Sequence, residues 1–173
     1  MPLIQKISPV GIDRNVDEIQ VILNELNWAG FNIYPRIYKE KIGDNVKPMA
    51  YVGNGEYVDV FNNDNLTTGN CFFYDSGTQT ATDLMYKNTQ LSIVFQVNLN
   101  VLFPSVLHRA DEEAHKAVLI KLRELSLPYE VTGIVKELEN VYSEFDTTQV
   151  QFDDIGKFHV FRVDMTCLVS YLC

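Results

Sequence analysis

Apolar and polar residues alternate along several stretches of the chain, most clearly in positions 91–103. From Leu91 to Phe103 every second residue is apolar, and most residues between them are polar. A period of two predicts a β-strand with one buried face. Such a strand would be about 43 Å long, whereas ordinary strands have about 5–6 residues. We therefore expect a strand that bends or that reaches beyond its own domain. Pro104 should end this strand, because proline lacks the N–H that strand pairing needs.

Shorter runs predict the other strands. Asn54-Gly55 lies between two β-prone runs and favours a tight hairpin turn, since both turn positions need positive φ. In the last run, every second residue from Phe161 is expected to lie on one face of the strand. The residues between them, beginning with Arg162, are expected to lie on the opposite face. Besides 91–103, the expected strands are 33–38, 50–61 as a hairpin, 71–74, 129–142 and 158–171.

Helical spacing appears twice. Apolar residues of 16–28 form one stripe, with Asn15 suited to cap the helix and Glu18 placed three residues later. A second helix is expected to begin near Ala110 and to end before Pro128. Its first turn is acidic and its last turn basic, as the helix dipole favours. The remaining segments are predicted to be an extended amino-terminal arm (1–12), a loop at 39–47, a protruding loop region (62–88) and a loop at 147–156.

Two amphipathic helices cannot cover both faces of so large a sheet. We therefore predict a single α+β domain over 1–173, with an antiparallel or mixed sheet and both helices packed on one face. The other sheet face is expected to be semi-polar and suited to solvent, a lumen or a partner. Its polar residues are Gln96, Asn98, Asn100, Arg162, Thr166 and Ser170.

Composition and charge exclude several function classes. The 173 residues are 46% hydrophobic, which is too apolar for a disordered chain. Fourteen Lys and Arg against 23 Asp and Glu give a formal charge of −9. A chain this acidic is not expected to grip nucleic-acid phosphates or anionic membranes. We also expect no signal peptide and no membrane span.

Candidate chemistry is sparse. Cys71, Cys167 and Cys173 have no paired spacing and are expected to be reduced structural thiols of an intracellular protein. No phosphate-loop, dinucleotide-binding or nucleophile-elbow motif is present. His108, Glu112 and His115 would share a helix face and are potential metal ligands, against the alternative of a solvated helix start. His159 is interpreted as a strand surface residue.

The order helix, hairpin, long strand, helix, strand resembles the tail terminator (tail-completion, neck) proteins of tailed bacteriophages. The similarity spans roughly 13–171. It rests on a leading helix, Tyr34-Pro35-Arg36-Ile37, the Glu56–Val60 hairpin arm, the Leu91–Leu99 strand, the His108–His115 helix start and the Phe158–Val163 strand. It departs from the compact family form in 62–87.

The resemblance implies a structural virion protein and not an enzyme. Such proteins form homo-oligomeric rings, commonly hexamers, which join the tail tube to the head connector around a DNA passage and need no cofactor. The implied partners are other copies, tube and connector proteins, with DNA only as passing cargo and no membrane. The implied location is the virion tail or neck, and the host cytoplasm during assembly.

The expected contact regions are the arm and the protruding loop. Candidate interface residues are Ile4, Ile7, Asn63, Leu66, Phe72, Tyr74, Gln96, Asn98 and Arg162. Two alternatives stay open at this point: a small metal-dependent enzyme using His108, Glu112 and His115, and an acidic cellular adaptor domain.

Overall fold

The computed structural model describes residues 3–61, 68–82, 85–126, 128–147 and 158–170. Along the chain the elements are α1 (Ile12–Asn24), β1 (Asn32–Arg36), β2 (Tyr38–Ile42), β3 (Asn45–Gly53), β4 (Glu56–Asp59), β5 (Gly69–Ala81), β6 (Tyr86–Asn98), α2 (Leu99–Leu102), α3 (Asp111–Leu122), β7 (Tyr129–Lys136), α4 (Leu138–Val141) and β8 (Phe158–Ser170). These elements confirm the predicted α+β class.

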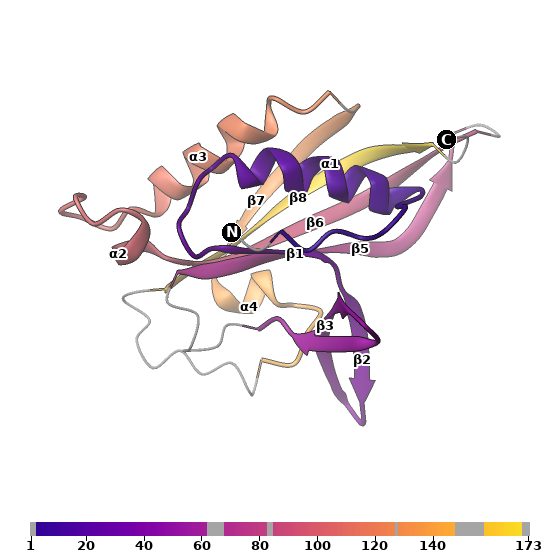
Figure 1. Cartoon of the computed structure of the whole chain (residues 1–173), viewed down its shortest axis with the longest axis horizontal. Coiled ribbons are helices and arrows are strands. Elements are labelled where there is room, and N and C mark those ends of the chain that lie inside the picture. Colours follow the sequence, from indigo (N-terminus) through magenta and orange to yellow (C-terminus); the bar gives the residue numbers. More distant parts are fainter. Residues whose placement is uncertain (1–2, 62–67, 83–84, 127, 148–157, 171–173) are drawn as a thin grey trace.

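Two sheets organise the fold (Figure 1). The larger has the strand order β1-β5-β6-β8-β7, and only its β1–β5 pair is parallel. The smaller, β2-β3-β4, is antiparallel and projects from the opposite side of the larger sheet to α1 and α3. The predicted mixed sheet with both long helices on one face is therefore confirmed.

The main hydrophobic core lies between that helical layer and the large sheet. The predicted alternation of β6 and β8 is correct here, because Phe95 and Phe161 are fully buried neighbours that stack with ring centroids 4.7 Å apart. The α1 stripe contributes Val16, Ile19 and Leu23, all at most 1% exposed. Burying large apolar side chains contributes about 1.5–3 kcal/mol each, so this interface dominates the stability of the fold.

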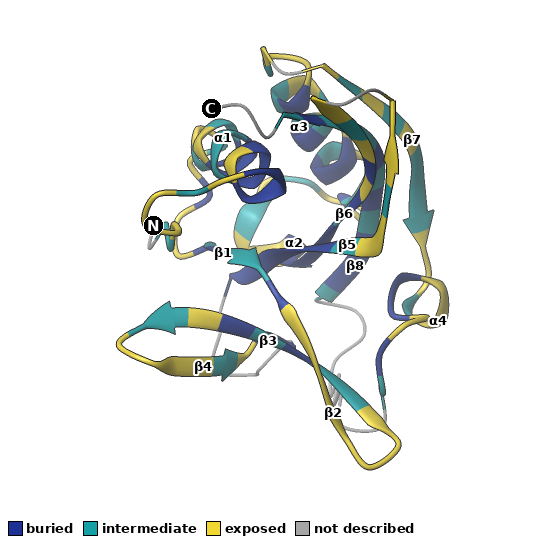
Figure 2. Cartoon of the chain, turned by 90° about the vertical axis from the view of Figure 1, so that its right-hand side faces the viewer, coloured by how far each residue is buried: buried dark blue, intermediate teal, exposed yellow. Residues whose placement is uncertain are grey.

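The other sheet face carries a second core, which corrects the expectation of a face open to solvent or a partner. Phe72 and Tyr74 of β5 and Val94 of β6 pack there against Tyr142 and Phe145, with the segment around Phe61 completing the cluster. Figure 2 shows how α4 and the small sheet lie on this side. The prediction failed because the covering residues come from segments interpreted as loop or strand.

Polar residues of this face are paired inside the second core. Gln96 is fully buried; its Nε2 donates to Asn70 Oδ1 and Val60 O, both at 2.8 Å, and its Oε1 accepts from the Tyr142 hydroxyl at 2.7 Å. Gly69 makes the close approach of β5 to β6 possible: its φ is +117°, and a Cβ there would lie 1.9 Å from Gln96 O.

The long strand is displaced from its predicted position. β6 has thirteen residues, as expected, but runs from Tyr86 to Asn98. The side chain of Asn98 accepts from Val101 N–H at 3.3 Å and caps α2, so local capping overrides the alternating pattern after it. Much of the predicted protruding loop 62–88 is instead β5 and the start of β6, which pair with each other in antiparallel register.

Other boundaries also differ. The predicted loop 39–47 forms most of the β2–β3 hairpin, because short strands of mixed charge lack an apolar signal. The strand expected to run to 142 ends at Lys136, and Glu137 adopts φ +70° before α4. α1 begins at Ile12 after Gly11; Asn15 is buried and donates to Leu168 O at 3.3 Å, so it does not cap the helix.

The start of the amino-terminal arm packs against α1 and β1 of the same chain. Leu3 bridges Ile33 of β1 in parallel, and Ile4 O accepts from Gln20 Nε2 at 2.9 Å. Further along, Ile7 is 93% exposed. Arg36 then ties α1 to the sheet, since its guanidinium donates to Asp13 at 2.7 Å and to Asp75 at 2.9 Å.

Candidate functional site

The helical triad predicted as a possible metal site is not assembled. His108 precedes α3, has a side chain 72% exposed and lies 3.4 Å from Glu113, whereas the His115 side chain is 3% exposed. Glu112 pairs with Lys136 of β7 at 2.5 Å. Within the described residues no group of three His, Cys, Asp or Glu side chains could hold a metal ion.

Two histidines instead form a buried pair between α3 and β8. His159, which the sequence led us to place on the surface, is 5% exposed, and its Nε2 lies 2.8 Å from His115 Nε2. The ring of His159 stacks on Phe161, and the ring of His115 meets Phe161 edge-on. The pair could not be predicted from the sequence. His159 is a single histidine in a strand of alternating burial, and its partner lies in a helix 44 residues earlier in the chain.

The neighbours of the pair fix its proton positions. Arg109 can only donate, and its Nη2 lies 3.0 Å from His159 Nδ1, so that nitrogen accepts. The His159 proton is therefore on Nε2 and is donated to His115 Nε2. His115 then carries its own proton on Nδ1, 3.6 Å from Glu112 Oε2. This distance is too long for a hydrogen bond.

The surroundings keep both rings neutral. Burial, the adjacent His115 and Arg109 lower the pKa of His159 to about 4, although Asp111 acts in the opposite direction. Burial and Lys136 lower the pKa of His115 against the effect of Glu112. Protonating His115 would put two N–H groups face to face at the shared 2.8 Å contact, and protonating His159 would put an N–H at Nδ1 against the Arg109 guanidinium. The arrangement therefore favours one neutral tautomer state at neutral pH.

Neither described cysteine supplies an activated thiol. Cys71 and Cys167 are buried and free, as predicted, while Cys173 lies outside the described residues. Burial raises the pKa of the Cys167 thiol to about 11 and that of Cys71 further. Thiols held in the protonated form are poor nucleophiles.

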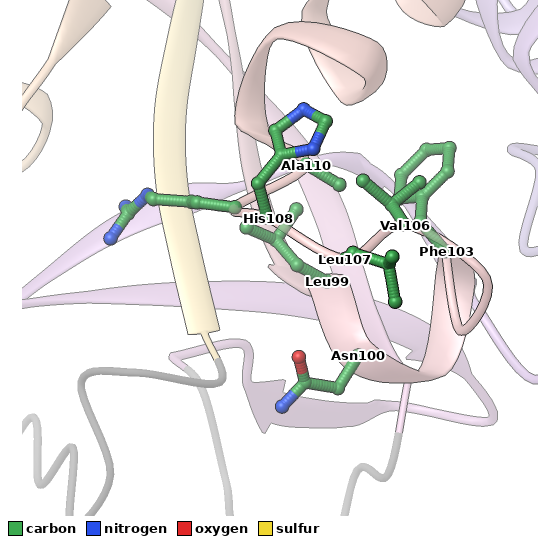
Figure 3. Close-up of a pocket in the computed structure, with 8 residues that line it drawn as sticks. Leu99, Asn100, Phe103, Val106, Leu107, His108 and Ala110 are labelled. Atoms are coloured by element: carbon green, nitrogen blue, oxygen red, sulfur yellow. The ribbon is translucent and has the colours of Figure 1, made fainter.

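A pocket of about 330 Å³ lies at the start of the α3 region (Figure 3). It is formed by α2 and the segment leading into α3, and its lining residues are Leu99, Asn100, Phe103, Val106, Leu107, His108, Arg109 and Ala110. Arg109 connects the two features, because it lines the pocket and also contacts His159. Its guanidinium lies 3.4 Å from Asp111 as well, so its charge is already partly neutralised.

An exposed aromatic surface is present on the small sheet. Tyr38, Tyr51 and Tyr57, which we call the tyrosine surface, are 54%, 42% and 51% exposed. Tyr57 contacts both of the others, with ring centroids 5.6 Å from Tyr38 and 5.2 Å from Tyr51. Figure 2 shows the small sheet extending from the body with much of its surface exposed. This surface was not predicted from the sequence, although Tyr51 and Tyr57 flank the Asn-Gly turn of the predicted hairpin.

The candidate interface residues are distributed differently from their prediction. Phe72, Tyr74, Gln96 and Asn98 are at most 8% exposed and lie within the chain's own packing. They were chosen because their strands were expected to have an uncovered face. Their burial leaves no free surface at these positions.

Of the other candidates, Ile4, Ile7 and Arg162 lie among the residues that the structure describes. Ile4 is half-buried against β1, whereas Ile7 is almost fully exposed. Arg162 donates to Asp164 and to the carbonyls of Asn140 and Val141, and so fixes α4 to β8. Asn63 and Leu66 lie outside the described residues.

Comparison of the chain with protein-family models, with curated proteins and with solved structures finds no match. Among the described helices, none is both long and apolar enough to cross a membrane.

Proposed function

We propose that this chain is a structural virion protein, a ring-forming tail terminator or neck subunit that joins the tail tube to the head connector. The observation that carries the proposal is the tyrosine surface on a projecting sheet. Exposed tyrosines in contact with one another are typical of protein–protein contact sites, since they offer large rigid contact area. The described His, Cys, Asp and Glu side chains, by contrast, form no group of three that could hold a metal ion.

Electrostatics agree with a passage for DNA. A formal charge of −9 per subunit repels phosphate backbones, so a ring of such subunits would let DNA slide past. Basic surfaces would instead retain DNA through counterion release. The proposal therefore predicts no retention of the protein on immobilised duplex DNA at 150 mM salt, where electrostatic binding would be detected.

Native mass spectrometry and negative-stain electron microscopy test the proposal directly. The full chain is examined alone at increasing concentration and again with a phage tail-tube protein added. We expect closed rings with a central opening, with Tyr57→Ser reducing assembly and Val21→Ser, an exposed change on α1, leaving it intact. A protein that stays monomeric under both conditions overturns the proposal.

A further inference from the structure

Three strand edges of the fold are unpaired among the described residues. In the large sheet, β7 pairs with β8 alone, whereas the opposite edge at β1 is partly covered by Leu3. In the small sheet, β2 and β4 each pair with β3 alone. All five residues of β2 are exposed. Unpaired edges present backbone N–H and C=O groups to another strand.

Charge distinguishes these edges. β2 carries Lys39 and Lys41 on one face, and Lys41 has no ion pair with any described residue. β4 carries Glu56 and Asp59 and is acidic. Glu130 is exposed near the start of β7 and likewise has no described ion-pair partner. Lysines protect an isolated edge from pairing, but an acidic partner edge turns them into favourable contacts.

We propose that β2 of one copy adds to the β7 edge of a second copy in antiparallel register, with Lys41 opposite Glu130. This inference rests on the proposed function, because it specifies how neighbouring subunits would associate. The register places Ile42, which is 58% exposed, opposite the half-buried Tyr129. Lys39, Lys41 and Glu130 then lie on one face of the joined strands, and Ile42 and Tyr129 lie on the other, where Glu40 is opposite Val131.

Two competing edge pairs bring like charges together. Antiparallel self-pairing of β2 centred on Glu40 would place Lys39 opposite Lys41, and like charges directly opposite are destabilising. Pairing of β4 with β7 would bring Glu56 and Asp59 toward Glu130. Joining β2 to β7 uses two different surfaces, so one subunit of a joined pair keeps a free β7 edge and the other keeps a free β2 edge for the next neighbour. A repeated head-to-tail contact of this kind closes into a ring when its rotation allows.

A crosslinking experiment on the unmutated chain tests the contact without any risk of misfolding. Equal amounts of ¹⁵N-labelled and unlabelled protein are mixed, dissociated, reassembled and treated with a carbodiimide. This reagent joins a lysine amine to a touching carboxylate as an amide with loss of water. We expect a Lys41–Glu130 crosslinked peptide pair with one heavy and one light member. The inference is overturned if the Lys41–Glu130 pairs are only light–light and heavy–heavy, or if assembled protein contains no such crosslink.

Charge reversal gives a second test. Lys41→Glu and Glu130→Lys should each raise the concentration needed for half-assembly about three- to tenfold, and combining them should restore it. Lys116→Glu on α3, an exposed lysine without a described ion pair, is the matched control. If rings form at the same half-assembly concentration in all these variants, the β2–β7 contact is overturned but the proposed function is not. A wild-type protein that never self-associates overturns both.

Discussion

Nε2 of His115 and Nε2 of His159 lie 2.8 Å apart inside the fold, so one imidazole donates and the other accepts. The contact joins α3 to β8, and a proton added to either ring is unfavourable: on His115 it faces the His159 N–H, and on His159 it faces the Arg109 guanidinium. Stability should therefore depend on pH in the range where histidines of an unfolded chain take up protons.

Acidification from pH 7 to pH 5 should lower the free energy of unfolding. An unfolded histidine titrates near pH 6.5, whereas the pKa of folded His159 is about 4. Between these values the unfolded state binds more protons, so stability rises with pH and is lost as pH falls. The lowered pKa of His115 acts with the same sign. Urea unfolding at several pH values should show a loss of about 1–3 kcal/mol.

Variants separate this effect from general acid sensitivity. His159→Gln should flatten the slope between pH 5 and 7, whereas His108→Gln should preserve it, because the His108 side chain is 72% exposed. An unchanged slope in His159→Gln would show that the pair does not control the pH response.

Removing the Tyr142 hydroxyl should destabilise the second core. Tyr142→Phe leaves Gln96 Oε1 buried without its 2.7 Å donor, and such a loss costs about 1–3 kcal/mol. Tyr57→Phe removes an exposed hydroxyl and should change stability little. Equal thermal midpoints for the two variants would contradict the role of this hydrogen bond.

Gly69→Ala should be among the most damaging single changes in the chain. Both the positive φ and the contact of the new Cβ with Gln96 O oppose it, and backbone strain of this kind alone costs about 1–3 kcal/mol. Gly133→Ala is the control, since a Cβ there has open space and no positive φ. Denaturant midpoints of the two variants should differ clearly, and a Gly69→Ala protein as stable as the control would refute the close approach.

Arg36 should stabilise the junction of α1 with the sheet. Arg36→Gln removes its ion pairs with Asp13 and Asp75, leaving Asp13 to Lys6 alone, and should cost about 1–3 kcal/mol. The exposed Arg14 on α1 has no described ion pair, so Arg14→Gln should cost far less. Chemical denaturation measures both.

The sequence predicted the fold where burial is periodic. The alternation of β6 and β8 and the stripe of α1 identified the faces that meet in the main core. It did not predict the β2–β3 hairpin, because Lys39, Glu40 and Lys41 form a strand without any apolar period. Nor did it predict the histidine pair, since pairing across a tertiary contact leaves no local pattern.

The pairing of β6 with β8 over Tyr86–Asn98 and Phe158–Ser170 affects how the protein can form during synthesis. β8 is the neighbour of both β6 and β7, yet it is translated after all other strands. Until Ser170 has left the ribosome, the inner edge of β6 and the whole of β7 have no partner. Since unpaired apolar strands promote aggregation, nascent chains should need shielding by a chaperone from the emergence of β6 until β8 is complete.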